Sequence, residues 1–442
     1  MRSSLALALA LSLPLVAASP ARAGVPGWGK RSQVGQLVRT LDAMKKGAPR
    51  KTGFIARQPL LQKLAAFVRP GLSTKDDVRR LEGFLAEAEA RFGAPISTLA
   101  HPALVDGQRM RAEKAIALMQ YGRRPEEVTE TFLHTTAKVK GAENLADRDI
   151  FVQRWKPIGK PSGKVYVMSP GFLQSGRNFY EQIQILNQAG HDVVVLDHQW
   201  AGYTADAARG VQKGMIDRGF GIARDVADVA AYGNALLERE YGGHPDKQLV
   251  LVGTSMGGGP GVLGALKLYD EGRIELGAGR TIPKDRGWIL QGGFLGRNKT
   301  FINNMLDFLG RIPGIRFLRL PAMGLPLLND HATTTAKLAA HAAAEDLHGR
   351  PQAFRAAIAD IDELRARIAA TGAPLGRGYV IHTAGDHLAD AKTMLQAVAD
   401  MQRDGSGRVR LDLLPGKDHV LEETAGEQLR VLEGAKFVAG EK

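Results

Sequence analysis

Residues 249–264 have the sequence Leu-Val-Leu-Val-Gly-Thr-Ser-Met-Gly-Gly-Gly-Pro-Gly-Val-Leu-Gly. The first four are apolar, with two β-branched valines among them, which is typical of a strand buried on both faces of a parallel sheet. Gly253-Thr254-Ser255-Met256-Gly257 follows as a G-x-S-x-G pentapeptide, in which a sharp strand-to-helix turn presents the serine. Pro260 falls in the first turn of the expected helix, where its missing N–H leaves no hydrogen bond unmade. We therefore predict a nucleophile elbow at Ser255.

The same glycines also form patterns that nucleotide-binding proteins use. Gly259, Gly261 and Gly264 spell G-x-G-x-x-G, but a dinucleotide-binding fingerprint begins at the strand end, and this one begins inside the expected helix. No lysine follows the glycines, as a phosphate-binding loop would require. The stretch therefore predicts neither kind of site.

Composition sets the class of protein. The 442 residues exceed the usual domain of roughly 100–200, which favours one large α/β unit with an additional segment. The absence of cysteine excludes disulfides and thiolate metal sites. The net charge of +13 is compatible with peripheral contact with an anionic membrane surface. The basic residues are dispersed, with no basic helix carrying interleaved aromatics, so we expect a generally basic surface and no nucleic-acid partner.

The beginning of the chain is typical of an export signal. Arg2 precedes an apolar run from Leu5 to Ala18, and Ala21-Arg22-Ala23 resembles a cleavage site. The run is too short to span a bilayer. We therefore expect residues 1–23 to be a signal peptide and the protein to be periplasmic or secreted.

Residues 24–123 form a second region, with helical spacing of apolar residues and no strand signals. Helices are expected over 74–92, where Gly93 and Pro95 end the pattern, and over 106–121. No catalytic constellation occurs in this region. It is interpreted as an N-terminal helical segment that packs on the main domain or binds a partner.

From residue 124 to residue 442 the chain alternates between strand and helix patterns. Helices are expected over 178–189 and 219–241. Together with the elbow strand, such alternation implies a mostly parallel sheet covered by helices on both faces. The other strands are expected at 128–136, 149–155, 164–169, 193–196, 289–290, 379–382 and 409–414.

Between Phe294 and about residue 350 this alternation breaks off. Large apolar residues are crowded there, and 294–320 contains five basic residues and one acid, Asp307. An insertion of this kind between two strands suits a helical cap over the strand ends. Its apolar residues form either an ordinary cap core or an acyl-binding or interfacial surface.

A serine hydroxyl becomes a nucleophile when a base takes its proton, a third group orients that base, and N–H groups hold the oxyanion. Asp386 lies in the turn after the strand at 379–383, and His419 lies on a loop after the last strand. The order Ser255, Asp386, His419 is the nucleophile, acid and base order of α/β-hydrolases. Asp390 and Asp418 remain alternatives for the acid.

Over residues 125–442 the chain resembles the α/β-hydrolase superfamily. Thr-Ser-Met-Gly-Gly, residues 254–258, looks like the monoacylglycerol-lipase and serine-aminopeptidase-like branch. The resemblance implies an eight-stranded core, a cap between the sixth and seventh strands, and hydrolysis through an acyl-enzyme without cofactor or metal. It rests on the elbow, Ser169-Pro170-Gly171-Phe172, Asp197-His198-Gln199-Trp200-Ala201-Gly202, and the turns at Asp386 and His419.

One departure concerns the loop that forms the oxyanion hole. This loop usually starts His-Gly, whereas here it is Ser169-Pro170-Gly171. The hole needs N–H groups rather than a particular side chain, so the backbone N–H groups of Phe172 and Met256 are expected to donate.

The signal peptide and the three candidate catalytic residues together predict an exported serine hydrolase that cleaves carboxylic esters. Its substrate is expected to be a small-molecule or lipid-like ester. A peptidase or amidase of the same branch is one alternative, and it would need acidic residues in the cap to hold a substrate amine. A non-catalytic lipid-binding or ligand-binding protein on the same fold is another.

Several further histidines have no assigned role. His382, His387 and Asp390 could suggest a metal cluster, but they are divided between a strand and a turn, with no paired helical histidines, so a metal is not expected. His198 and Trp200 either line the pocket or pack in the core.

Overall fold

The computed structural model of the chain describes residues 110–142, 147–172, 174–198, 220–296, 351–386, 388–416 and 425–441, with shorter pieces that include 86–93, 307–313 and His419. The predicted signal peptide at 1–23 and most of the predicted cap at 294–350 lie outside the described residues. Trp200, His387 and Asp418 lie outside them as well.

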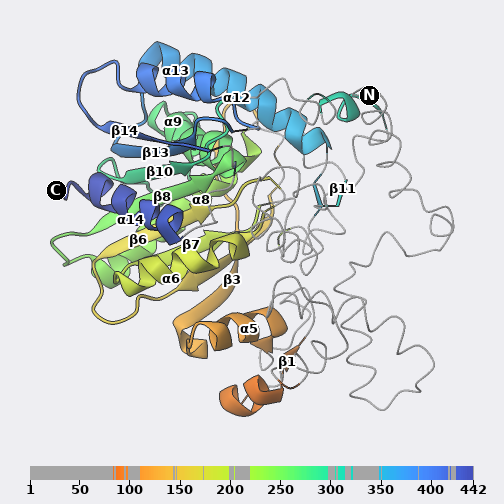
Figure 1. Ribbon diagram of the computed structural model, residues 1–442, viewed down its shortest axis with the longest axis vertical. Coiled ribbons are helices and arrows are strands. Elements are labelled where there is room, and N and C mark those ends of the chain that lie inside the picture. Colours follow the sequence, from red (N-terminus) through yellow and green to blue (C-terminus); the bar gives the residue numbers. More distant parts are fainter. Residues whose placement is uncertain are drawn as a thin grey trace.

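The centre of the fold is an eight-stranded sheet with the order β14-β13-β10-β8-β6-β7-β5-β3 (Figure 1). Strand β5 runs antiparallel to its neighbours β3 and β7, and the other neighbouring strands are parallel. The predicted mostly parallel sheet of eight strands is confirmed. The strands are β3 (Val128–His134), β5 (Asp149–Trp155), β6 (Lys164–Ser169), β7 (Asp192–Leu196), β8 (Gln248–Thr254), β10 (Gly287–Gln291), β13 (Arg377–Thr383) and β14 (Val409–Leu414).

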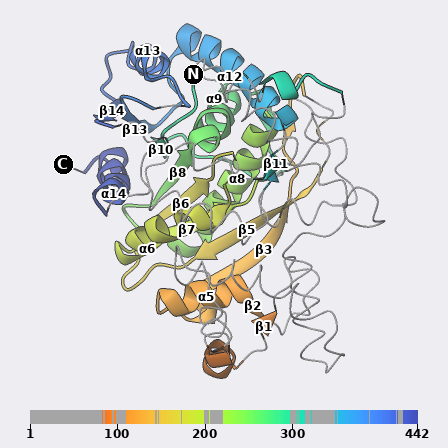
Figure 2. The same ribbon diagram turned by 45° about the vertical axis from the view of Figure 1, so that its right-hand side comes forward.

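Helices cover both faces of this sheet. Figures 1 and 2 show α6 (Tyr180–Gln188) and α14 (Ala425–Ala439) on one face, and α8 (Gly221–Tyr241) and α9 (Gly264–Asp270) on the other. In β8, Leu249 and Leu251 pack in the cluster with α8 and α9, and Val250 and Val252 pack in the cluster with α6 and α14. Burying each such side chain contributes about 1.5–3 kcal/mol. This two-sided burial explains why the strand is apolar without alternation.

The expectation that residues 24–123 contain no strands is wrong. Two short strands, β1 (Ile96–Ser97) and β2 (Met110–Arg111), pair in parallel. Because this pairing keeps the chain extended at 110–111, the helix expected from residue 106 begins only at 112, as α5 (Ala112–Gln120). The other expected helix is observed over 86–92 and ends at Gly93, whose φ is +62°.

Helix α5 is packed onto the main domain. Ala115, Ala117 and Leu118 are buried in the same cluster as α6 and α14. The division of the chain at residue 123 remains a prediction. In the part of the chain that the structure describes, no helix combines the length and the hydropathy needed to cross a membrane.

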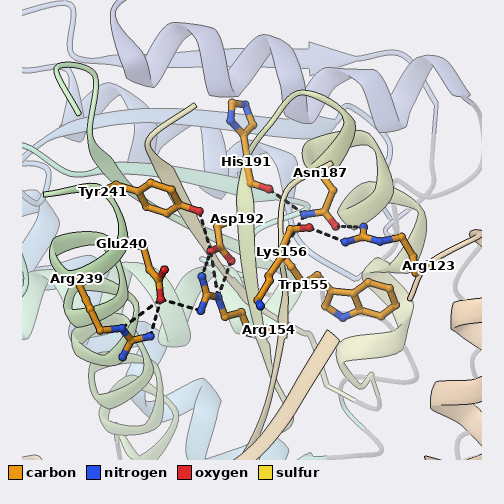
Figure 3. Close-up of polar contacts among 10 residues, drawn as sticks. All are labelled: Arg123, Arg154, Trp155, Lys156, Asn187, His191, Asp192, Arg239, Glu240 and Tyr241. Atoms are coloured by element: carbon orange, nitrogen blue, oxygen red, sulfur yellow. Dashed lines mark hydrogen bonds and ion pairs between the residues drawn. The ribbon is translucent and has the colours of Figure 1, made fainter. Parts of the chain in front are cut away.

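A buried polar network ties β5 to β7 and to the end of α8 (Figure 3). The guanidinium of Arg154 donates to both carboxylate oxygens of Asp192, at 2.6–3.2 Å, and the Tyr241 hydroxyl donates to the same carboxylate at 3.1 Å. Charge-assisted hydrogen bonds of this kind are directional. They hold the antiparallel strand in register with the parallel part of the sheet.

A second buried contact fixes the start of α8. Phe220 precedes the helix with φ +57°, and its N–H donates to the Asp360 carboxylate. Asp360 lies on α12 (Pro351–Thr371), a helix that was not predicted from the sequence. Asp360 is 5% exposed. Burial raises the pKa of its carboxyl group to about 7; the Phe220 hydrogen bond opposes this shift and the charge of Glu363 adds to it.

This shift predicts a pH-dependent stability. Between about pH 4 and pH 7 the folded chain holds a proton on Asp360 that the unfolded chain has lost, so the contribution of Asp360 to stability falls as the pH rises through that window. In Asp360→Asn the amide oxygen can accept the same N–H and carries no charge. Thermal unfolding should give similar Tm values for the two proteins at pH 4, where Asp360 is protonated in the folded chain and still partly protonated in the unfolded chain, and a higher Tm, by a few degrees, for the variant at pH 8. Tm curves that run parallel over the whole range would contradict this assignment.

Candidate active site

The candidate site lies where the strand order reverses. From β6 the chain passes through α6 to β7 on one side, and it then returns through α8 to β8 on the other side of β6. Loops that leave the carboxyl ends of two such strands diverge, and ligands of open α/β sheets bind there. Ser169 and Gly253 are register partners at this edge. The loops after β6 and β8 therefore start side by side.

Ser255 directly follows β8 in a backbone conformation that non-glycine residues rarely adopt, with φ +54°. A Cβ on Gly253 would lie 2.4 Å from the Gly257 carbonyl oxygen, and one on Gly257 would lie 2.3 Å from the carbonyl oxygens of Ser169 and Pro170. Both positions therefore require glycine, because a side chain there would overlap the backbone. The turn has the geometry that the sequence predicts for a nucleophile elbow.

Three side chains from separate strand ends form one chain of hydrogen bonds. His419 Nε2 lies 2.7 Å from Ser255 Oγ, and His419 Nδ1 lies 2.7 Å from Asp386 Oδ2. Their exposed fractions are 8% for Ser255, 4% for Asp386 and 2% for His419. The structure thus brings together the three residues that the sequence analysis selected. In this arrangement the imidazole can take the serine proton while the carboxylate holds the other ring nitrogen.

The surroundings of Asp386 keep its carboxylate ionised. Burial alone would raise the pKa of this group, but the charge of His419 and its hydrogen bond outweigh burial, so the pKa lies below its ordinary value. Its second oxygen accepts the N–H groups of Leu388 and Ala389 at 2.8 and 2.9 Å.

The alternative acid Asp390 has a different position. It is the N-cap of α13 (Ala391–Met401), and its carboxylate accepts the Thr393 N–H at 3.1 Å. This carboxylate therefore serves the first turn of the helix. Of the described candidates, Asp386 is the one in contact with His419.

His419 is positioned by the turn after β10. Gly292 has φ +53°, and a Cβ there would lie 2.4 Å from the His419 carbonyl oxygen. Phe294, two residues further on, packs edge-on against the His419 ring at 6.4 Å between ring centres, and its N–H donates to the Ser255 carbonyl at 3.0 Å. Gly292 and Phe294 were not predicted from the sequence to belong to the site. The one sequence feature that could have indicated them is their position directly after an expected parallel strand.

The expected oxyanion donors lie beside Ser255. Met256 directly follows the serine and is buried. On the opposite loop, a Cβ on Gly171 would lie 2.9 Å from Ser255 Cβ, so the backbone leading to Phe172 is in close contact with the elbow. The Phe172 ring packs against Phe354 of α12, which in turn packs against Phe294, with ring centres 5.7 and 6.0 Å apart. No sequence signal pointed to Phe354.

The remaining histidines occupy distinct positions. His382 is buried in β13, with Nε2 4.0 Å from Asp386 Oδ2, and burial lowers its pKa. Of the two residues grouped with it as a possible metal cluster, His387 is not described and Asp390 caps a helix. Within the described ranges, no group of three or more histidine, aspartate or glutamate side chains is arranged to hold a metal. His198 lies with Nε2 3.0 Å from Ser169 Oγ.

The chain belongs to the alpha/beta hydrolase family, whose model matches residues 166–430. A soluble variant of monoglyceride lipase from Saccharomyces cerevisiae, solved with a substrate analogue, is similar at 17% identity and a TM-score of 0.52, over 69% of this chain and 94% of the lipase. A carboxyl esterase from Bacillus coagulans, solved with glycerol, has 17% identity and a TM-score of 0.47, over 71% of this chain and 97% of the esterase. No curated protein matches the chain. At such identity the likeness to the lipase supports the fold alone.

The tight elbow predicts that Gly257→Ala is destabilising. The added methyl group would overlap two backbone carbonyls that cannot rotate away, and such overpacking costs about 1–3 kcal/mol. Urea unfolding should show this loss. Gly243→Ala is the matched control, because a Cβ there has nothing within 4 Å and φ is not positive. Equal free energies of unfolding for the two variants would contradict the account of the elbow.

Proposed function

We propose that this protein is a serine hydrolase that cleaves carboxylic esters through an acyl-enzyme on Ser255. The observation that carries the proposal is the hydrogen-bonded series Ser255–His419–Asp386, with both links at 2.7 Å, built on a turn that holds the serine at positive φ. The family supports hydrolysis in general. The residue roles and the ester substrate are proposals.

The geometry supports a two-stage reaction. His419 Nε2 accepts the proton of Ser255 Oγ while that oxygen bonds to the ester carbonyl carbon, and the carbonyl oxygen takes the displaced electron pair. The N–H groups of Phe172 and Met256 would donate to this oxyanion. Its collapse breaks the bond to the alcohol, which leaves with the proton from His419. Water then repeats the sequence on the acyl-enzyme and releases the acid, while Asp386 keeps the imidazole in one tautomer throughout.

Two observations favour an ester over a peptide with a free amine. Asp307, the only acidic residue in 294–320, has its carboxylate 2.7 Å from the Arg311 guanidinium, so a cation already neutralises it. Beside the triad, Phe172, Phe294 and Phe354 form an apolar cluster. A peptidase or amidase is therefore the second candidate, and a substrate amine would need an acid from elsewhere.

Export is a further part of the proposal. It rests on the sequence of residues 1–23 alone. Cleavage after Ala23 would leave Gly24 as the first residue of the mature chain. N-terminal sequencing of protein recovered from the periplasm or medium should find that residue, whereas an intact Met1 would argue against export. The net charge of +13 makes peripheral contact with anionic membranes a further proposal.

Substitution of the nucleophile tests the reaction. A panel of esters with graded acyl chains and the matching amides should show turnover of esters in the wild type and background rates in Ser255→Ala. Turnover of amides with faster rates than esters would favour the peptidase. Binding of an ester analogue that is unchanged in Ser255→Ala, with no turnover by the wild type, would favour a non-catalytic binding protein.

Paired substitutions test the acid. Asp386→Asn should lower kcat by about 10³–10⁴-fold, since the amide favours the wrong imidazole tautomer. Asp390→Asn is the matched control four residues away, because asparagine caps a helix as well as aspartate and should leave kcat near the wild-type value. The reverse order of effects would exclude Asp386 as the acid.

A further inference from the structure

His198 holds the loop that leads to the expected oxyanion donor. It follows β7 after Asp197 and is completely buried. Its Nε2 lies 3.0 Å from Ser169 Oγ, and the ring also makes a hydrogen bond with the backbone of Pro170. Because proline has no N–H, the ring is the donor and the Pro170 carbonyl is the acceptor. One side chain therefore contacts two consecutive residues at the carboxyl end of β6.

The His198 ring is suited to this double contact because it is neutral. Burial lowers its pKa to about 3, and the hydrogen bond to Pro170 and the charge of Arg148 act in opposite directions on it. A neutral imidazole can carry its one N–H on Nε2, the nitrogen that faces Ser169. This N–H can donate to the Pro170 carbonyl and the Ser169 hydroxyl without placing a charge near the triad.

Two further hydrogen bonds hold described residues of this loop. The Gly171 N–H donates to Gln174 Oε1, and the Gly176 N–H donates to Asp197 Oδ1, both at 2.8 Å. Asp197 and His198 thus fix both ends of the segment 169–176 from the end of β7. The carbonyls of Ser169 and Pro170 abut Gly257 at the elbow, so a displacement of the loop changes its position relative to Ser255.

We propose that His198 is a positioning residue of the oxyanion hole, which keeps the Phe172 N–H aimed at the oxyanion that forms on Ser255. This inference rests on the proposed function. The oxyanion exists only after attack, so a displaced donor weakens binding of the transition state more than binding of the ester. Loss of His198 should therefore appear in kcat rather than in KM.

Two substitutions of His198 test the inference on an ester that the wild type hydrolyses. His198→Phe keeps the ring volume and removes both hydrogen bonds, and His198→Gln supplies an N–H donor again. For His198→Phe we expect kcat to fall about 10–100-fold and KM to change less than about twofold. This loss of kcat is no larger than that caused by removing a whole oxyanion donor. Inhibition by a trifluoromethyl ketone, which forms an oxyanion on the serine, should weaken in parallel, and His198→Gln should recover most of both.

His191→Phe is the matched control. His191 is also a buried histidine, stacked on Tyr166 with ring centres 4.8 Å apart, and its Nδ1 lies 2.6 Å from Ser162 Oγ. It lies at the opposite end of β7, and Figure 3 shows its ring pointing away from the network of Arg154 and Asp192. This variant should lose stability without losing kcat. An equal loss of kcat in the two phenylalanine variants, or an unchanged kcat in His198→Phe, overturns the inference.

Ser169→Ala gives a second route if His198→Phe does not fold. It leaves the ring in place and removes one of its two hydrogen bonds, so kcat should fall several-fold at constant KM, and a wild-type kcat would overturn the inference. A wild type that neither hydrolyses esters nor reacts at Ser255 would remove the proposed function and this inference together. An active wild type with an unaffected His198→Phe removes this inference alone.

Discussion

The site depends on one backbone constraint, the positive φ of Ser255 between β8 and the helix that follows. A left-handed conformation costs a non-glycine residue about 1–2 kcal/mol. The cost is offset because the turn is held on both sides: β8 is paired with β6 and β10, and the Phe294 N–H donates to the Ser255 carbonyl. Gly253 and Gly257 provide the space that lets the chain reverse within five residues.

The other parts of the site follow from this bend. Because the parallel strands end at one edge, the turns after β8, β13 and β14 bring Ser255, Asp386 and His419 together although 164 residues separate the first and the last. The loop after β6 reaches the same point because β6 is the neighbour of β8. The β7 end lies beside β6, and so His198 can reach Ser169. The topology of the sheet therefore supplies the nucleophile, the base, the acid and the supports of the oxyanion loop.

Much of this could be predicted from the sequence, for physical reasons that differ between elements. The strands of the sheet are short apolar runs, such as 249–252, because both of their faces are buried. The candidate triad could be predicted because its residues stand directly after such runs. The two-residue strands β1 and β2 could not be predicted, since two residues show no periodicity. The sequence favours Asp386 and leaves Asp390 open as the acid, because the difference lies in where α13 begins. The contact of His198 with Ser169 depends on strand order, which local patterns do not contain.

The central claim is that the bend at Ser255 makes its hydroxyl a nucleophile through His419. The most direct measurement is peptide mass spectrometry of the folded protein after reaction with a fluorophosphonate, together with a urea-unfolded sample. The account predicts a single phosphonyl adduct on the peptide that contains Ser255, absent from the unfolded sample and strongly reduced in His419→Ala. An unmodified Ser255 in the folded protein, or an adduct that forms equally well after unfolding, would contradict it.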